Sequence, residues 1–273
     1  MMKTILVATD GSEAASAAER FGIALAGKLD ATVSGITVAE ERDMRAPNAD
    51  SLSLPNFPES ELANYYRARA EAVAQRFATV ARSSGLTAHC EATQGIADEK
   101  IVESAQSSDV LVAGRDGKGA AHHGGLVGST IHGVVRKINR STFVVPLGAS
   151  LSGPIVLGFD GSPGSRVAAN LAVQLANGLG EAVHVFVDSK DKGRAVARFE
   201  EVRQLVGGLA VPVRETSSTL GRPDVKIVDA AREARAGFIA MGAFGRNRIS
   251  DYFLGSNAAA VVRTSPVAVL LAR

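Results

Sequence analysis

Short apolar runs rich in Val, Ile and Leu alternate along this chain with longer segments in which apolar residues recur every three or four positions. The first pattern predicts strands and the second predicts amphipathic helices. The expected order is βαβαβαβαβ, and it occurs twice. Ten strands are predicted, at residues 3–9, 32–38, 86–93, 109–114 and 142–147, and then at 154–159, 182–188, 210–217, 237–242 and 266–272.

The chain also repeats itself, because residues 4–29 match residues 154–179 at an offset of 150. In each copy an apolar strand ends in Asp-Gly-Ser, at residues 10–12 and 160–162. A helix with one buried stripe is predicted to follow, since its apolar residues recur every four positions. The expected core positions are Ala17, Phe21, Leu25 and Leu29 in the first copy, and Val167, Leu171, Leu175 and Leu179 in the second. Such a repeat predicts two homologous halves.

A second match pairs residues 108–117 with residues 236–245, at an offset of only 128. The offset shrinks because residues 40–60, rich in Pro, Asn, Ser and charge, have no counterpart of similar size in the second half, and we interpret them as a loop insertion. Residues 146–154 combine Pro, Gly and Ser between two apolar strands, a composition typical of a short linker. We therefore expect one domain at residues 1–149 and a second at 150–273.

Strands that are apolar along most of their length indicate a parallel sheet covered by helices on both faces. The predicted fold class is therefore α/β, with two tandem doubly wound parallel sheets of five strands each. In such sheets ligands bind beyond the carboxyl ends of the strands, where the winding direction reverses. The segments that follow the first and fourth strands of each half are the expected place for a site.

Composition narrows the classes of protein that fit. The chain is 46% apolar and 21% charged, as expected of a packed globular protein, and its formal charge is only +2. Aromatic residues are not interleaved with basic clusters, so we expect no nucleic acid partner. The longest apolar run, Val267 to Ala272, is far too short to cross a membrane, and we expect a cytoplasmic protein. A single cysteine, Cys90, excludes an internal disulfide framework and a cysteine-based zinc site.

The fourth strand of the second half opens into a glycine-rich segment. Gly242 and Gly245 are followed after nine residues by Gly255 and Ser256, where a helix is predicted to begin. Glycines let a backbone approach an anion closely, and the free N–H groups at a helix N-terminus favour phosphate. The segment is therefore a candidate phosphate site, with Ser256 as the helix N-cap and Arg246 and Arg248 as sources of positive charge.

The alternative is that these residues serve only local structure. Two glycines at a strand end and Gly-Ser at a helix start also occur in loops that bind nothing. Asp10 and Asp160 are equally open, because Asp-Gly-Ser after a strand is a common turn and helix cap as well as an acceptor for ribose or base donors. His122 and His123 lack a Cys or an i, i+4 partner, and we expect no metal there.

Three features together resemble the universal stress protein family in a tandem two-domain form. They are a first strand ending in Asp, the pattern G-x2-G-x9-G-[ST] after the fourth strand, and a closing helix and apolar strand at residues 258–273. The resemblance covers nearly the whole chain except the insertion. It implies a strand order of 3-2-1-4-5 and a site between strands one and four that binds ATP in many members. It also implies that the last strands of the two halves pair, here residues 142–147 with 266–272.

The resemblance assigns a set of residues to the nucleotide in each half. In the second half Asp160 would meet the ribose and adenine, Val187 would give backbone contacts to the base, and the phosphates would be lined by Met241, Gly242, Gly245, Gly255, Ser256 and Asn257. Whether Val187 corresponds to Thr37 or to Val38 is open by one residue. The matching residues of the first half are Asp10, Val38, Gly114, Gly117, Gly128, Ser129 and Thr130.

The first half departs from the family pattern. Ten residues instead of nine separate Gly117 from Gly128, and Asp116 brings negative charge to the phosphate end unless Arg115 and Lys118 offset it. Whether one half or both bind nucleotide is therefore left open.

The sequence also lacks a P-loop, a G-x-S-x-G elbow and an H-E-x-x-H motif, and no catalytic constellation stands out. We expect a regulatory protein of the stress-response type that binds ATP, with or without Mg²⁺, and has an unidentified protein partner. The alternatives are a slow ATPase or phosphotransferase that uses Asp160 as a metal-facing carboxylate, and an interaction module that binds no nucleotide. We expect the two domains to pair with each other within one chain, and whether two chains form a homodimer stays open.

Overall fold

A computed structural model describes residues 2–44, 59–117, 128–207, 211–219, 221–244 and 254–273. The first half contains strands β1 (Thr4–Ala8), β2 (Thr32–Glu40), β3 (His89–Gly95), β4 (Val110–Gly114) and β5 (Ser141–Val145). Its helices are α1 (Glu13–Leu29), α2 (Glu41–Met44), α3 (Glu59–Ser83), α4 (Ala97–Ala105) and α5 (Ser129–Lys137).

The second half repeats this order without a counterpart of α2. Its strands are β6 (Ile155–Gly158), β7 (Val183–Asp188), β8 (Val213–Ser218), β9 (Phe238–Gly242) and β10 (Ala268–Ala272). Its helices are α6 (Pro163–Leu179), α7 (Lys192–Val206), α8 (Pro223–Ala234) and α9 (Ser256–Thr264). Each of the ten predicted strand segments contains an observed strand or overlaps most of one. In the predicted loop at residues 40–60, residue 40 ends β2, residues 41–44 form α2 and residues 59–60 begin α3, whereas residues 45–58 lie outside the described part of the chain.

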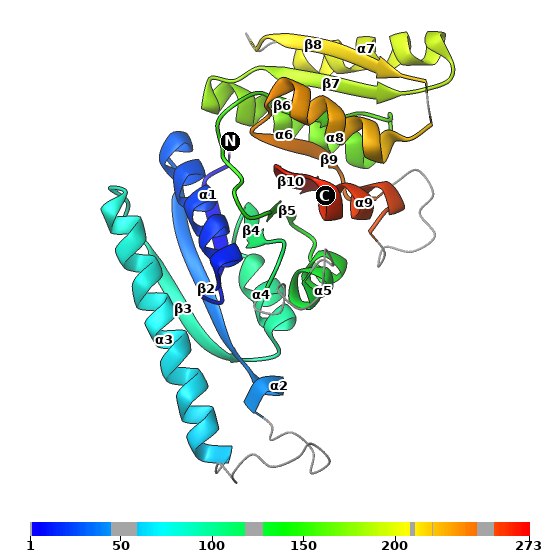
Figure 1. Ribbon diagram of the computed structural model, residues 1–273. Coiled ribbons are helices and arrows are strands. Elements are labelled where there is room, and N and C mark those ends of the chain that lie inside the picture. Colours follow the sequence, from blue (N-terminus) through cyan, green and yellow to red (C-terminus); the bar gives the residue numbers. More distant parts are fainter. Residues whose placement is uncertain (1, 45–58, 118–127, 208–210, 220, 245–253) are drawn as a thin grey trace, which may run out of the picture.

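The strands form one continuous sheet in the order β3-β2-β1-β4-β5-β10-β9-β6-β7-β8. Each half thus has the predicted order 3-2-1-4-5, and its strands are parallel. The expected pairing of the last strands is confirmed, because β5 and β10 are antiparallel neighbours in which Phe143 lies opposite Leu270. The two expected sheets are therefore joined edge to edge into one (Figure 1).

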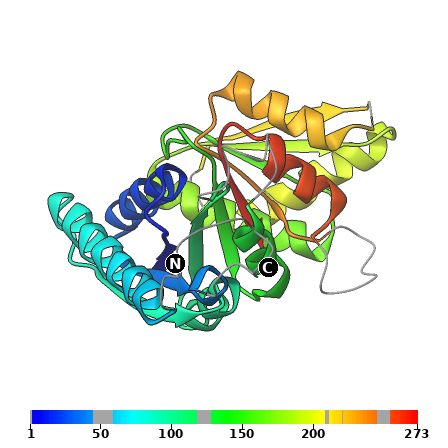
Figure 2. The same cartoon turned by 60° about the horizontal axis from the view of Figure 1, so that its bottom comes forward.

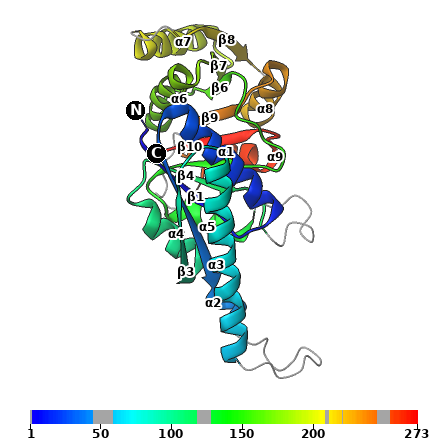
Figure 3. The same ribbon diagram turned by 90° about the vertical axis from the view of Figure 1, so that its left-hand side faces the viewer.

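Helices cover both faces of the sheet (Figures 1 and 2). Alternate residues of each central strand point to opposite faces, so Ile5 and Val7 of β1 lie on the face covered by α1, α3, α6 and α7, whereas Leu6 and Ala8 lie on the face covered by α4, α5, α8 and α9. The edge strands β3 and β8 are largely exposed. In Figure 3 the long helix α3 runs along β3 and extends beyond the sheet. None of the helices described is long and apolar enough to cross a membrane.

The buried stripe of α1 is confirmed. In α6 Leu175 is buried, and Leu171 and Leu179 pack partly buried against the core, as predicted, but the prediction of Val167 as a core position was wrong. Val167 is 37% exposed, whereas the neighbouring Ala168 and Ala172 have no exposed surface. The cause lies at the start of the helix, where Gly164 packs directly against Gly242 at the end of β9. This close approach turns the small residues of α6 toward the sheet and leaves Val167 at the surface.

Candidate functional site

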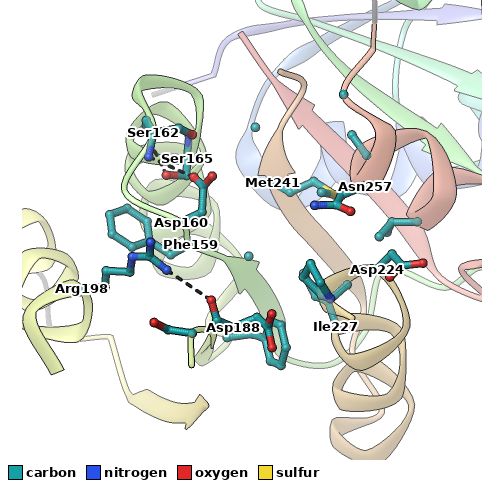
Figure 4. A pocket seen from close by; sticks show the side chains of 18 of the residues that line it. Phe159, Asp160, Ser162, Ser165, Asp188, Arg198, Asp224, Ile227, Met241 and Asn257 are labelled. Carbon is teal, nitrogen blue, oxygen red and sulfur yellow. Dashed lines mark hydrogen bonds between the residues drawn. The ribbon is translucent and has the colours of Figure 1, made fainter. Parts of the chain in front are cut away.

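A cavity of about 790 Å³ lies at the carboxyl ends of β6, β7 and β9 in the second half. Residues from the N-terminal parts of α6, α7, α8 and α9 also line it. This is the crevice at which the winding direction of the sheet reverses, because β6 continues to β7 on one side and pairs with β9 on the other. Figure 4 shows side chains from these elements converging on the cavity.

Asp160 follows β6 at the mouth of the cavity. Its Oδ1 accepts a hydrogen bond from the backbone N–H of Ser162 at 2.9 Å, and the Ser162 hydroxyl accepts one from the N–H of Ser165 at 3.2 Å. The Asp-Gly-Ser segment therefore forms a turn and caps α6, which was one of the two interpretations of the sequence. The cap and a ligand contact are compatible, because Asp160 also lines the cavity.

The phosphate end predicted from the sequence comes together on the opposite wall. Met241, Gly242, Gly255, Ser256 and Asn257 all line the cavity, whereas Gly245 lies outside the described residues, as do Arg246 and Arg248. The N-cap of α9 is Gly255, and no side chain caps the helix, so the prediction of Ser256 as N-cap was wrong by one residue. The first N–H groups of a helix have no intrahelical acceptor, and in α9 they lie at the cavity.

Gly242 has a packing role that the sequence did not reveal. A Cβ at this position would lie 2.8 Å from the carbonyl carbon of Gly164 and 3.0 Å from the backbone nitrogen of Ser165. Distances this short are not tolerated between carbon and backbone atoms. The absence of a side chain at Gly242 is therefore explained by the contact between β9 and α6, whether or not an anion binds nearby.

The register of the sheet resolves the one-residue ambiguity over Val187. The N–H of Thr9 donates to the carbonyl of Ile36, and the N–H of Phe159 donates to that of Phe186, both at 2.9 Å. Ile36 is thus equivalent to Phe186, so that Val187 is equivalent to Thr37 and Asp188 is equivalent to Val38. Val187 is fully buried on the other face of the sheet, whereas Phe186 and Asp188 line the cavity.

Two charged residues in the cavity were missed by the sequence analysis. Asp188 ends β7, and one of its carboxylate oxygens is buried with no hydrogen-bond partner in the part of the chain that the structure describes. Arg198 of α7 is only 7% exposed and donates from Nη1 to the carbonyl oxygen of Asp188 at 3.3 Å. The alternation along β7, in which Val183, Val185 and Val187 share one face, could have placed Asp188 on the cavity side.

The first half has the same framework with different side chains. Asp10 accepts from the N–H of Ser12 at 2.9 Å, as Asp160 does from Ser162. Gly128 caps α5, and Ser129 and Thr130 are exposed at its first turn. A Cβ on Gly114 would lie 3.1 Å from the carbonyl oxygen of Ala14, whereas one on Gly117 would meet nothing within 4 Å. Val38 packs partly buried against the core.

Charge at the phosphate end of the first half is partly neutralised. The Arg115 Nε lies 3.2 Å from both carboxylate oxygens of Asp116. Its Nη1 donates to the carbonyl oxygen of Ser265 at 2.9 Å, so this guanidinium also contacts the second half. Lys118 and the histidines at 122 and 123 lie outside the described residues. Within the described ranges, no group of three His, Cys, Asp or Glu side chains is arranged to hold a metal ion.

Comparison with known proteins agrees with this architecture. The family model described as "Universal stress protein family" matches residues 1–146 and 152–273. A universal stress protein of Mycolicibacterium smegmatis is 25% identical over 288 residues, covering 98% of this chain and 96% of that protein. One from Synechocystis is 24% identical over 296 residues and is covered completely.

A solved structure resembles the whole chain. The crystal structure of a universal stress protein from Archaeoglobus fulgidus has a TM-score of 0.78 at 20% identity, with 99% of this chain and 98% of that chain covered. A likeness at this identity shows the shared fold. The family match over both halves shows that the chain belongs to the universal stress protein family.

Proposed function

We propose that the second half of this protein binds an adenine nucleotide, ATP with or without Mg²⁺, and that occupancy of this site is a signal read by a protein partner in the cytoplasm. The observation that carries the proposal is the convergence of Asp160 after β6, Met241 and Gly242 at the end of β9, and the N-terminus of α9 on one cavity. These segments are far apart in the sequence. They are also the segments to which the family resemblance assigns the nucleotide.

The N-terminus of α9 suits a phosphate chain. Its first-turn N–H groups point out of the helix without intrahelical acceptors, and the helix dipole makes this end positive. Ser256 and Asn257 are exposed there and add a hydroxyl and an amide to the available donors. A triphosphate placed here leaves its nucleoside to extend across the cavity toward Asp160 and Phe186.

The rest of the cavity suits a nucleoside. Phe186, Pro223, Ile227 and Met241 provide apolar surface for a purine ring, and Asp160 supplies a carboxylate for ribose hydroxyls. The volume of about 790 Å³ lies within the usual range for small-molecule sites, roughly 300 to 1,000 Å³. The lining also includes Lys190, Arg194 and Arg198, which partly balance its four aspartates.

Ser256→Glu tests this site without disturbing the packing at Gly242. An acidic residue in the first turn stabilises a helix by about 0.3 to 1 kcal/mol, so the protein should remain folded. The same charge repels a phosphate, and at a few ångströms the repulsion should weaken ATP binding about tenfold or more. Ser83→Glu is the control, because it adds the same charge at an exposed serine of α3 that does not line the cavity.

Binding of labelled ATP with Mg²⁺ is measured by filter retention, and the bound nucleotide is then identified. We expect intact ATP on the original protein and on Ser83→Glu, with strong loss on Ser256→Glu. Failure of the original protein to retain any nucleotide would overturn the proposal. Equal retention by Ser256→Glu would show that α9 is not the phosphate site, and steady release of ADP would favour the slow ATPase instead.

A further inference from the structure

The two halves differ at one edge of the cavity in a way that the fold does not require. The hydrogen bonds from Thr9 to Ile36 and from Phe159 to Phe186 align the second strands of the halves, and place Val38 where the second half has Asp188. An apolar side chain two residues before the end of β2 therefore corresponds to a carboxylate at the end of β7.

The helix that packs beside this position shows a second replacement of the same kind. The glycine after β1, Gly11, faces Val73 of α3, whereas the equivalent Gly161 faces Arg198 and Glu201 of α7. Three residues farther along α3, Arg76 contacts Ser16, as Glu201 contacts the equivalent Arg166. This spacing makes Arg198 the counterpart of Val73. Val38 and Val73 of the first half thus correspond to two residues of opposite charge, Asp188 and Arg198, in the second half.

These buried charges lower the stability of the folded protein. Among the residues described, one buried carboxylate oxygen of Asp188 has no hydrogen-bond partner, and the buried guanidinium of Arg198 forms no ion pair with any carboxylate. Its hydrogen bond to the Asp188 carbonyl holds the end of β7 in place. Since two valines support the same fold in the first half, the cost points to a ligand-binding role for the charges.

The surroundings identify the part of the ligand that Asp188 would meet. Asp188 and Phe186 are two residues apart and face the same side of β7, so the carboxylate lies at the edge of an apolar wall that also includes Ile227. In Figure 4 Asp188 and Arg198 lie across the cavity from Asn257 at the phosphate end. A flat base stacked on this wall presents its edge to Asp188. Rotation about the terminal carboxyl bond, which has a broad torsional profile, turns the unpartnered oxygen toward that edge.

We propose that Asp188 is a specificity-determining residue that accepts a hydrogen bond from an N–H of the purine base, with Arg198 as the residue that positions it. The inference rests on the proposed nucleotide site and adds which part of the ligand is recognised. Adenine offers its amino group and guanine offers a ring N–H and an amino group, whereas unsubstituted purine offers no N–H donor. Val38 gives the first half no equivalent side-chain acceptor.

The test compares the original protein, Asp188→Val and Asp188→Asn by calorimetry with ATP, GTP, 2′-deoxy-ATP and purine riboside triphosphate. The expected effect is on whichever of ATP and GTP the original protein binds more tightly. Asp188→Val should bind this nucleotide about tenfold or more weakly. Asp188→Asn keeps a carbonyl acceptor and should lose less affinity. Affinity for purine riboside triphosphate should not fall. Asp229→Asn is the control, because Asp229 of α8 does not line the cavity and pairs with Lys226 at 3.1 Å.

Each outcome bears on one of the two proposals. If no nucleotide binds the original protein, the nucleotide site itself is wrong, and if only GTP binds, adenine is the wrong base. If ATP or GTP binds but Asp188→Val changes all four affinities alike, Asp188 does not read the base. If Asp188→Val removes only the difference in affinity between ATP and 2′-deoxy-ATP, Asp188 contacts the ribose. This result would also overturn the inference.

Discussion

Glu19 of α1 is a carboxylate enclosed in the core, with only 1% of its surface exposed. It accepts hydrogen bonds from the Thr9 hydroxyl and from Arg76 of α3. Burial raises the pKa of this carboxyl above its ordinary value of 4.5, although Thr9 and Arg76 act in the opposite direction. At the equivalent positions the second half has Phe159 and Ala169, so the polar group is not needed to form the sheet and helix.

The raised pKa makes the stability contribution of Glu19 depend on pH. Between the unfolded pKa near 4.5 and the higher folded pKa, the folded protein binds more protons than the unfolded chain, so stability falls as pH rises. Glu19→Gln removes this titration and keeps an acceptor for Thr9. We therefore expect the variant to gain stability relative to the original protein as the pH is raised from below 4.5 to neutrality.

Urea unfolding midpoints across this pH range measure the effect. Glu71→Gln on the exposed surface of α3 is the control, because it also removes one carboxylate but not a buried one. A stability difference between Glu19→Gln and the original protein that stays constant with pH would contradict the prediction.

The site residues that the sequence identified are those whose role is local. Asp160, Gly255 and Ser256 lie where a strand ends or a helix begins, and such positions are marked by short motifs. Asp188 and Arg198 could not be found this way, because their importance comes from burial beside each other on β7 and α7. Gly242 was identified as a phosphate contact, while its packing against Gly164 depends on how closely α6 approaches the sheet.

At the scale of elements, the helices α1 and α6 end in the same backbone conformation with different residues. The C-cap of α1 is Asp30, with φ 51°, and that of α6 is Gly180, with φ 70°. Left-handed backbone costs an ordinary L-residue roughly 1 to 2 kcal/mol, less for Asp, and costs glycine almost nothing. The first half therefore carries strain that its repeat avoids.

We expect Asp30→Gly to raise the free energy of unfolding by up to about 1 kcal/mol and Gly180→Asp to lower it similarly, since no atom would crowd a Cβ at Gly180. Thermal unfolding should show shifts of about 2 to 4 °C in opposite directions. Shifts of the same sign in the two variants would show that the cap conformation does not control stability here.

Strand positions were predictable because a buried parallel strand is a short, continuous apolar run bounded by turn residues, as in residues 110–114 and 238–242. The rotation of α6 was not, because Val167 and Ala168 are both compatible with a helical stripe. The contact between Gly164 and Gly242, 78 positions apart in the sequence, decides which of them is buried.

At the scale of the molecule, the halves are joined by more than the pairing of β5 and β10. Phe143 of β5 packs against Phe21 and Phe238, with both ring centroids 5.1 Å away, so one aromatic cluster spans the junction. Two arginines also cross it in opposite directions. Arg115 of the first half donates to the carbonyl oxygen of Ser265, and Arg273 of the second half donates to those of Val135 and Ile138.

Arg273 connects the junction to the cavity. Its guanidinium lies 4.3 Å from the centre of the Phe244 ring, which lines the cavity, and it also neutralises carbonyl groups at the end of α5. Removing it leaves these carbonyls without their charged donor. We expect Arg273→Ala to lower the free energy of unfolding by about 2 kcal/mol, because hydrogen bonds to charged groups contribute about 1.5 to 3 kcal/mol.

Urea unfolding gives the stability, and hydrogen exchange locates the change. Amides of β5 and β10 should exchange faster in Arg273→Ala, because these two strands pair with each other at the junction. Arg232→Ala is the control, since that arginine is 59% exposed and lies 3.8 Å from Asp229, where a surface ion pair contributes little. Equal effects of the two substitutions, or faster exchange spread evenly over the sheet, would show that Arg273 does not hold the two halves together.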